Sequence, residues 1–267
     1  MLNAGKKNVI GILMDAADYD AALDKIFSAA RNRQSATVTA LAVHGLMTGA
    51  MDREHKFRLN HFDLVLPDGQ PIRWVLNALY KTALPDRVYG PNLTLKVCER
   101  AAKDGVPIYF YGTNPEILAS LQKSLEVKFP NIIIAGMEPS RFRRFTPEEK
   151  LEVAARIVAS GARMVFVGLG CPRQETFAFE FRELLPMPIL AVGAAFPFLA
   201  GLLPQAPRWM QDAGLEWLFR LSVEPRRLWR RYLLLNPAYM CLVALQATKI
   251  SRFSTEGQAP TTELLYG

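Results

Sequence analysis

Residues that build disulfides or metal sites are scarce in this sequence. Its three cysteines are Cys98, Cys171 and Cys241, and its three histidines are His44, His55 and His61. An odd number of widely separated cysteines argues against a disulfide framework and favours a reducing compartment. The histidines lack zinc-type spacing, and no cysteine pair supports them. We therefore expect no metal site and no cofactor.

Long apolar runs are also missing. The run from Val9 to Met14 follows two lysines and ends at Asp15, which is too short for the core of a signal peptide. The longest apolar stretch, Tyr232 to Leu245, contains Asn236-Pro237 and falls short of the roughly 20 residues of a spanning helix. We expect neither export by the usual route nor a membrane span.

What the sequence does have is enough apolar residues for a large core. Of its 267 residues, 50% are hydrophobic and 21% are charged, which excludes global disorder. Short apolar or β-branched runs alternate with helical stretches, a pattern typical of an α/β fold with a mostly parallel sheet covered by helices. The expected strands are 36–43, 62–66, 107–111, 131–135, 163–167 and 188–192. The expected helices are 20–32, 93–104, 115–128, 147–160 and 173–185.

The charge is concentrated near the carboxyl end. Residues 217–252 hold seven basic residues and one acid, so they carry +6 of the net charge of +7. The basic residues are Arg220, Arg226, Arg227, Arg230, Arg231, Lys249 and Arg252. We divide the chain into a core (1–200), a basic, aromatic-rich appendage (201–250) and a flexible tail (251–267) of Ser, Thr, Gly and Pro. The helical spacing of the arginines suits an anionic membrane surface, a nucleic acid or a solvated helix face.

The loops that follow the expected strands are the candidate binding elements, because ligands of open parallel sheets bind at the carboxyl ends of the strands. Asp68 follows one strand in the sequence Pro67-Asp68-Gly69. An Asp-Gly pair is usually a turn, although the fixed backbone around this one also suits a positioned general base. Gly112 and Thr113 stand between a strand and a helix start, which suits either an anion or an ordinary connection.

The segment Gly168-Leu-Gly170-Cys-Pro172-Arg-Gln174-Glu175 resembles a phosphate-binding turn without matching a known one. The third glycine of a dinucleotide fingerprint would fall at Arg173, and no Gly-Lys-Ser/Thr motif occurs. Cys171 is interpreted as a packing residue. Asp18-Tyr19-Asp20 has the form of a metal-binding Asp-x-Asp pair, but it precedes an expected helix and is interpreted as its cap.

Several ordered blocks together resemble the bacterial WecG/TagA/CpsF glycosyltransferases, known as glycosyltransferase family 26. The blocks are Pro67-Asp68-Gly69, Arg87-Val-Tyr-Gly90, Pro172-Arg-Gln174-Glu175, Ala206-Pro207-Arg-Trp209, Leu215-Glu216-Trp217 and Glu224-Pro225-Arg226-Arg227. The resemblance covers roughly residues 8–245. It implies a Rossmann-like core, a membrane-associated appendage, and inverting, metal-independent transfer from a UDP-sugar to an undecaprenyl-diphosphate-linked saccharide. It places the protein peripherally on the cytoplasmic face of the inner membrane.

The resemblance also implies roles for individual residues. Asp68 matches the proposed base, and Thr39 is the best match to a second implicated residue. The family usually has Thr-x-Asn there, whereas this chain has Thr39-Ala40-Leu41, which weakly favours a glucosyl transferase over an N-acetylmannosaminyl or N-acetylmannosaminuronyl one. The expected substrate contacts are Arg87, Asn92, Gly112, Thr113, Gly168, Gly170, Gln174 and Glu175, and the expected diphosphate or membrane contacts are Arg220, Arg226, Arg227, Arg230 and Arg231.

Alternatives remain at this point. A non-catalytic nucleotide- or RNA-binding protein would also use a basic appendage, although nucleic acid is the less favoured partner. The assembly state is open between a monomer and a homo-oligomer.

Overall fold

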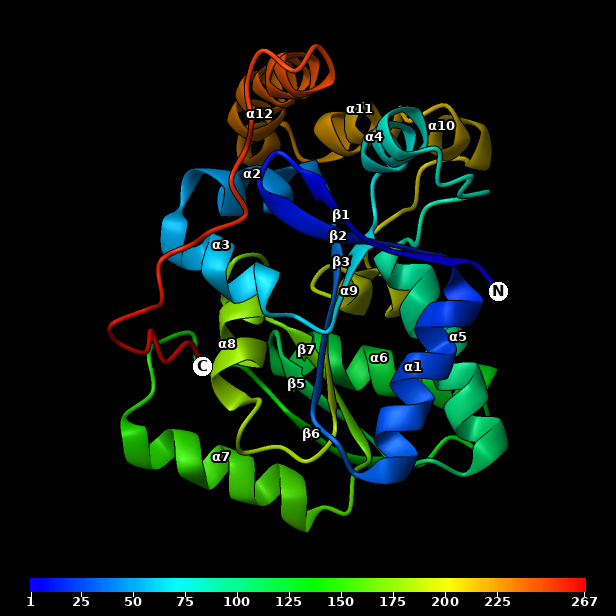
Figure 1. The fold of residues 1–267 in the computed structure, drawn as a ribbon. Helices are drawn as coiled ribbons and strands as arrows, with labels where there is room; N and C mark the ends of the chain where they lie inside the picture. Colours follow the sequence, from blue (N-terminus) through cyan, green and yellow to red (C-terminus); the bar gives the residue numbers. More distant parts are fainter.

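A six-stranded parallel sheet forms the centre of the protein (Figure 1). The computed structural model describes residues 1–267, apart from the side chains of Arg227 and Arg231. The strands are β3 (Ala36–Leu41), β4 (Leu64–Pro67), β5 (Ile108–Gly112), β6 (Ile134–Glu138), β7 (Met164–Gly168) and β8 (Pro188–Ala191). Their spatial order is β4-β3-β8-β7-β5-β6. The predicted α/β class is confirmed, with a sheet that is entirely parallel.

Each of the six expected strands is present. Five begin within two residues of the expected position, whereas β6 begins at Ile134 rather than at residue 131. β6 is an edge strand with every residue only half-buried. Its apolar signal is therefore weaker than that of the central strands, which are buried on both faces.

Helices cover both faces of the sheet. They include α1 (Tyr19–Asn32), α5 (Gly90–Asp104), α6 (Pro115–Lys128), α7 (Pro147–Ala159) and α8 (Arg173–Phe181). Their starts follow ordinary capping chemistry. Asp18 and Asn114 each accept a hydrogen bond from the third backbone N–H that follows, and Thr146 forms a capping box with Glu149. α8 ends at Phe181, earlier than the expected residue 185.

The strongest departure from the expected elements is an amino-terminal hairpin. It pairs β1 (Asn3–Val9) with β2 (Ile12–Ala17) in antiparallel fashion. Gly11, at φ +92°, makes the turn. The Asp15 carboxylate accepts hydrogen bonds from Lys6 Nζ and from the backbone N–H of Val65, both at 2.7 Å, and so fastens the hairpin beside β4.

Four helices in the core were also not anticipated. They are α2 (Val43–Met51), α3 (Arg53–Asn60), α4 (Gln70–Tyr80) and α9 (Ala195–Leu199). α2 and α3 pack against each other, and α3 also contacts α8. The contact of α3 with α8 brings His55 close to Cys171 and Glu175.

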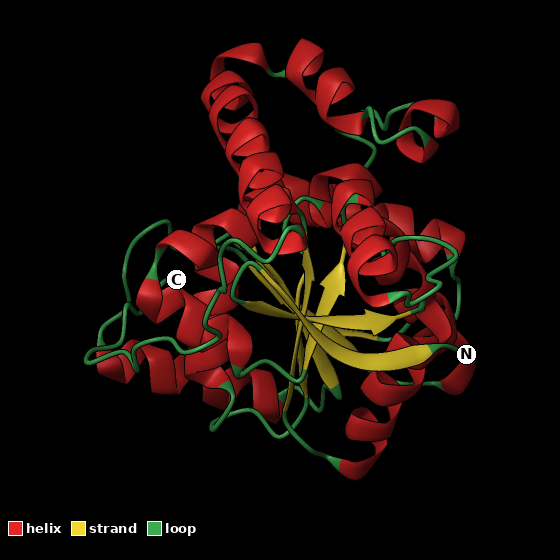
Figure 2. Cartoon of the chain, turned by 45° about the horizontal axis from the view of Figure 1, so that its top comes forward, coloured by secondary structure: helices red, strands yellow, loops and turns green.

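The appendage consists of α10 (Arg208–Asp212), α11 (Glu216–Val223) and α12 (Pro225–Ala247). Figure 2 shows these helices as an arm that rises from one end of the molecule. The second half of α12 packs on α2, where Tyr239 is buried, and Gln246 Nε2 donates to the carbonyl of Asn8 at 2.7 Å. Among the described residues, no helix combines the length and the apolar character that a membrane span requires.

Residues 251–267, called the C-terminal strap below, have almost no regular structure. Their composition predicted a loose tail, but the strap is hydrogen-bonded to the core along its length. Asn8 Nδ2 donates to the carbonyl of Phe253 at 2.7 Å, and the backbone N–H of Leu264 donates to Glu180 at 2.7 Å. The polar composition therefore indicates irregular backbone here and not a free end.

Candidate active site

A cavity of about 670 Å³ opens where the strands end. Its wall comes from the loops after β3, β4, β5, β7 and β8, and α11 of the appendage closes one side. This is the edge of a parallel sheet at which ligands are expected, and the volume lies in the range of small-molecule sites. The core and the appendage thus share one site.

Asp68 stands in this wall, directly after β4. Its backbone N–H donates to the carbonyl of Leu41 at 3.2 Å, and its Oδ1 accepts from the backbone N–H of Gly90 at 3.1 Å. These bonds fix the turn and hold the carboxylate in the cavity wall. The predicted turn and the predicted positioned carboxylate are therefore the same feature.

The surroundings of Asp68 make it an unusually weak acid for an aspartate. Desolvation of the enclosed carboxyl raises its pKa from 3.8 to about 6, and the negative charge of Glu216 acts in the same direction. The cations Arg87 and Arg220 oppose this shift without cancelling it. A carboxylate of this pKa is ionised at neutral pH and still takes up a proton more readily than an ordinary aspartate.

Arg87 links the Asp68 loop to the appendage. Its Nη2 donates to Glu216 Oε2 at 2.5 Å and to Gln211 Oε1 at 3.1 Å, and its Nη1 donates to the carbonyl of Asp68 at 3.2 Å. The guanidinium also lies over the ring of Tyr89 at 4.3 Å. Arg87 lines the cavity but is nearly fully buried. In this structure the predicted substrate contact Arg87 therefore acts as a clamp that holds α10 and α11 over the loop of Asp68.

The loop after β7 is held by its own glutamine. Gln174 Oε1 accepts from the backbone N–H of Gly170 at 3.1 Å, and its Nε2 donates to Glu175 Oε1 at 2.9 Å. Gly168 and Gly170, predicted to bind substrate, line the cavity, and a Cβ at Gly168 would overlap the ring of Phe196. The structure thus places this segment in the site and shows Gln174 shaping the loop from within.

Two predicted residues lie elsewhere than expected. Thr39 is fully buried beneath the wall, within β3, where its hydroxyl donates to Glu175 Oε1 at 3.1 Å. Asn92 is exposed on the first turn of α5, near Tyr19, and is not among the cavity residues. Thr39, predicted as a catalytic residue, therefore supports Glu175 in this structure, and its catalytic role stays a prediction. Asn92, predicted as a substrate contact, lies outside the cavity wall.

The loop after β5 matches the prediction at one of two positions. Thr113 lines the cavity, with a positive φ of 57°. Gly112 lies behind it and packs against the backbone of Gly168, where a Cβ would come within 2.8 Å. Gly112 therefore permits close strand packing and does not contact the cavity directly.

The arginines of the appendage fall into different places. Arg220 lines the cavity, and its guanidinium lies 5.6 Å from the centroid of the Phe198 ring. Arg226 and Arg230 are exposed and lie outside the wall. The side chains of Arg227 and Arg231, two further predicted contacts, lie outside the described part of the structure. Among the members of this set whose side chains the structure describes, Arg220 is the one that lines the cavity.

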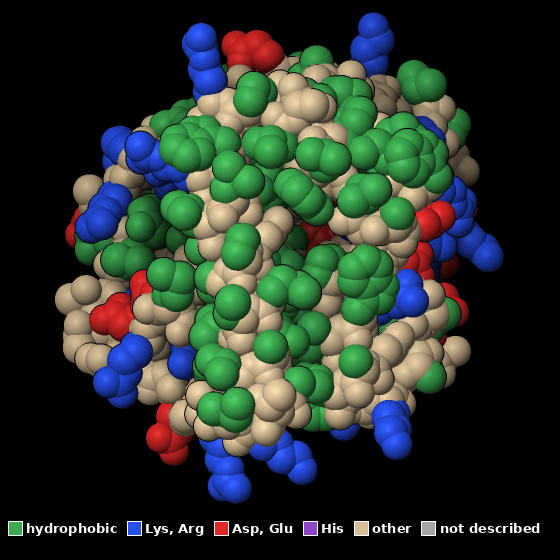
Figure 3. Space-filling view, turned by 90° about the horizontal axis from the view of Figure 1, so that it is seen from above, with side chains coloured by type: hydrophobic (Ala, Val, Ile, Leu, Met, Phe, Trp, Pro, Cys, Tyr) green, Lys and Arg blue, Asp and Glu red, His purple; other side chains and the backbone are tan. Residues whose placement is uncertain are grey.

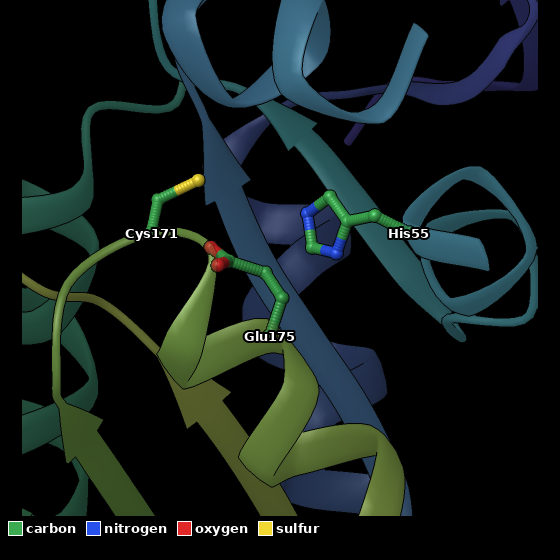
Figure 4. A group of neighbouring side chains, drawn as sticks. All are labelled: His55, Cys171 and Glu175. Carbon is green, nitrogen blue, oxygen red and sulfur yellow. The ribbon is translucent and has the colours of Figure 1, made fainter. Parts of the chain in front are cut away.

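At one side of the cavity, the fold gathers three side chains from distant parts of the sequence; two of them, Cys171 and the predicted contact Glu175, line the cavity, and the third lies behind them. They are His55 from α3, Cys171 from the turn before α8, and Glu175 from the first turn of α8 (Figure 4). Burial lowers the pKa of His55 to about 4 and raises that of Glu175. Sequence spacing gives no sign of this cluster, because 116 residues separate His55 from Cys171.

The arrangement combines a positioned carboxylate, the cavity-lining arginines Arg87, Arg173 and Arg220, and a helix amino-terminus beside a glycine turn. Such a set suits removal of a proton from one reactant and stabilisation of negative charge on another. Comparison with known families gives a match over residues 7–253, to the glycosyl transferase WecG/TagA/CpsF family.

Proposed function

The chain belongs to the WecG/TagA/CpsF family of glycosyltransferases, and we propose that it moves a sugar from a UDP-sugar to a polyprenyl-diphosphate-linked saccharide with inversion at the anomeric carbon. The observation that carries the proposal is the Asp68 carboxylate, which stands in the cavity wall with a pKa of about 6. The products serve the synthesis of an exopolysaccharide or another cell-surface polysaccharide.

In the proposed step, Asp68 takes the proton of an acceptor hydroxyl as that oxygen attacks the anomeric carbon. The new glycosidic bond forms on the face opposite the leaving group, and the bond between the sugar and UDP breaks with both electrons going to the diphosphate. General base catalysis of this kind contributes roughly 10²- to 10⁴-fold. The desolvated site strengthens the effect, since the carboxylate there is a better proton acceptor than one in water.

The departing UDP gains negative charge, and side-chain and backbone groups of the protein can stabilise that charge. Arg220 supplies a cation in the wall, and the start of α8 after Gly170 presents backbone N–H groups. Asp18, the first residue of the Asp-x-Asp pair, caps α1 by accepting from the backbone N–H of Ala21 at 2.9 Å, as predicted. We therefore propose that no divalent ion bound to an Asp-x-Asp pair takes part in the departure of UDP.

The residue at position 41 supports a donor without an N-acetyl group. Leu41 lines the cavity at the place where the resembling family carries asparagine. An apolar side chain cannot hydrogen-bond an amide of the sugar, so the balance favours a glucosyl donor over an N-acetylmannosaminyl one.

The appendage presents a face that suits a lipid surface. Viewed from above, apolar side chains gather over the helices of this end, and lysine and arginine side chains stand around the edge (Figure 3). Large exposed apolar residues of the appendage include Leu202, Trp209, Leu218, Val223, Trp229, Leu233, Leu234 and Met240. An apolar face with a basic rim is typical of peripheral binding to anionic membranes. We propose that the enzyme docks on the cytoplasmic face of the inner membrane, where its acceptor is anchored.

The test is release of UDP from a panel of UDP-sugars with a polyprenyl-diphosphate-glucose acceptor, comparing the wild type with Asp68→Asn. We expect acceptor-dependent turnover of one donor, lost in the variant. Turnover that the substitution leaves unchanged would remove Asp68 as the base. Silence with every donor and with other lipid-linked acceptors, together with salt-sensitive retention of RNA, would replace the proposal with a binding protein.

A further inference from the structure

The cluster of His55, Cys171 and Glu175 at the side of the cavity has the composition of a metal site. One ligand atom from each of His55, Cys171 and Glu175 lies within 4.8 Å of the other two. Figure 4 shows the imidazole of His55 directed across the gap between α3 and α8, toward the Glu175 carboxylate and the Cys171 sulfur. The packing of α3 against α8, and not any local sequence pattern, brings these three side chains together.

Two atoms of this cluster are buried without a hydrogen-bond partner. They are His55 Nε2 and Glu175 Oε2, on residues that are 2% and 1% exposed. Leaving a buried polar atom unsatisfied is unfavourable, so native proteins rarely contain two of them facing the same gap. Both atoms are good metal ligands, and their orientation toward each other is explained if an ion lies between them.

We propose that His55, Cys171 and Glu175 bind one zinc ion. Imidazole nitrogen, thiolate sulfur and carboxylate oxygen are the ligands that zinc takes in proteins, whereas magnesium and calcium avoid sulfur. A thiolate and a carboxylate together balance the charge of Zn²⁺, which suits a site enclosed by protein. Three protein ligands leave the fourth tetrahedral position to a water molecule or another oxygen.

Neighbouring groups hold these ligands in place. Glu175 Oε1 already accepts from Thr39 Oγ1 at 3.1 Å and from Gln174 Nε2 at 2.9 Å, which leaves Oε2 for the ion. The Cys171 thiol also donates to this carboxylate, so the bound ion would take the place of the thiol proton, which is released. Such outer contacts are typical of metal ligands. At Gly45, a Cβ would lie 3.2 Å from Cys171 Sγ, so the glycine leaves space around the sulfur.

The nearby charges are largely balanced within α3. Arg58, whose charge helps to lower the pKa of His55, pairs with Glu54 at 3.2 Å, and the Asp52 carboxylate caps the helix. The ion would tie α3 to the start of α8, and through Glu175 it would fix Thr39 and Gln174 beneath the substrate cavity. Its role is therefore to position the loop after β7, and it is separate from the proton transfer at Asp68.

The direct test is spectroscopic and uses cobalt as the probe. We expect the full-length protein, stripped with a chelator and titrated with Co²⁺, to bind one equivalent. The complex should show the intense visible bands of a tetrahedral site and a near-ultraviolet band of thiolate-to-cobalt charge transfer, and one equivalent of Zn²⁺ should remove both. Binding without the thiolate band, or no stoichiometric binding, would overturn the assignment.

Variants locate the site. Cys171→Ser should abolish the thiolate band, and His55→Gln should weaken Co²⁺ binding at least tenfold. Cys241→Ser and His61→Gln, which change exposed residues outside the cluster, should bind as the wild type does. A thiolate band that persists in Cys171→Ser and disappears in Cys241→Ser would refute the proposal. Because the readout is metal binding in the wild-type chain, its failure would leave the proposed transferase reaction intact.

Discussion

The carboxyl group of Asp68 loses its proton near pH 6 because the protein encloses it. If the ionised form is the base, kcat/KM should rise from pH 5 to pH 7 and level off above an apparent pKa of about 6. Asp68→Asn should lower kcat/KM by roughly 10²- to 10⁴-fold and remove this rise. UDP release measured across this range tests both effects, and a wild-type profile that stays flat through pH 6 would contradict the assignment.

The same ionisation has an opposite effect on stability. Between about pH 4 and pH 6 the folded protein holds the Asp68 proton and the unfolded chain does not, so stability contributed at this site falls as pH rises. Asparagine resembles the protonated acid and does not ionise, so the variant does not lose this stability as the pH rises. We therefore expect Asp68→Asn to be more stable than the wild type at pH 7, by on the order of 1–2 kcal/mol.

Urea unfolding at pH 7 and at pH 4 measures this difference. The advantage of Asp68→Asn should shrink toward pH 4, where both proteins carry a neutral side chain. An advantage that instead grows on acidification would show that ionisation stabilises the fold.

For single residues, the sequence predicted those positions that depend only on neighbours along the chain. Asp68 and Gly170 lie in the cavity wall because each follows a strand directly. The burial of Thr39 and its hydrogen bond to Glu175 could not be predicted, because its position in the chain does not show which face of β3 it occupies. The cluster of His55 with Cys171 depends on the contact of α3 with α8, and that contact is not encoded in any local pattern.

Among the secondary-structure elements, the parallel strands were the easiest to predict because both of their faces are apolar. β1 was not predicted because most of its residues are polar and exposed, so it lacks the apolar pattern of a buried strand. α4 was not predicted because it begins directly after the Asp68-Gly69 turn, and Gly69 provides no side-chain cap to mark the start of a helix.

The clamp between α11 and the Asp68 loop gives an element-scale prediction. Glu216→Gln leaves the Arg87 guanidinium without its charged partner, and breaking such a nearly buried pair costs about 3–5 kcal/mol. The same change removes a negative charge that raises the pKa of Asp68, so the rise of kcat/KM should move to lower pH. Chemical unfolding measures the loss of stability, and the pH dependence of kcat/KM measures the change in the pKa of Asp68.

Glu116→Gln provides the control, because Glu116 is exposed on the first turn of α6. It should leave the pH profile where it is in the wild type. A profile for Glu216→Gln that moves to higher pH would contradict the electrostatic role assigned to Glu216.

Membrane docking can be tested on α12 with a closely matched control. Leu233 on α12 and Leu151 on α7 are both 56% exposed, but they lie at opposite ends of the molecule (Figure 1). Placing a charge in a docking face opposes burial in lipid and repels anionic headgroups. We expect Leu233→Glu to weaken co-sedimentation with anionic vesicles several-fold, whereas Leu151→Glu should behave as the wild type. Equal losses in the two variants would argue against a docking face on the appendage.

For the whole molecule, the C-terminal strap makes a prediction about stability. Removing residues 252–267 would leave Asn8, Asn60 and Glu180 without the backbone partners that the strap now supplies. Each lost contact of this kind costs about 1 kcal/mol or more, so the free energy of unfolding should fall by roughly 2–4 kcal/mol. Thermal and urea unfolding measure the loss.

A change within the strap that keeps its backbone serves as the comparison. Glu256→Gln alters an exposed side chain and should leave the unfolding midpoint nearly unchanged. If the shortened protein unfolds at the same urea concentration as the wild type, the strap does not stabilise the core.

The strand order also has a consequence for the growing chain on the ribosome. One edge of β3 pairs with β8, which is translated about 150 residues later. The turn of the hairpin, at Ile10, forms its hydrogen bond to Gln246 only after a still longer stretch has been translated. At a synthesis rate of about 5–20 residues per second, one edge of β3 stays unpaired for on the order of 10 s. An open apolar edge is prone to pairing with another chain. We expect this interval to be the stage at which translation speed and chaperones most affect the yield of folded enzyme.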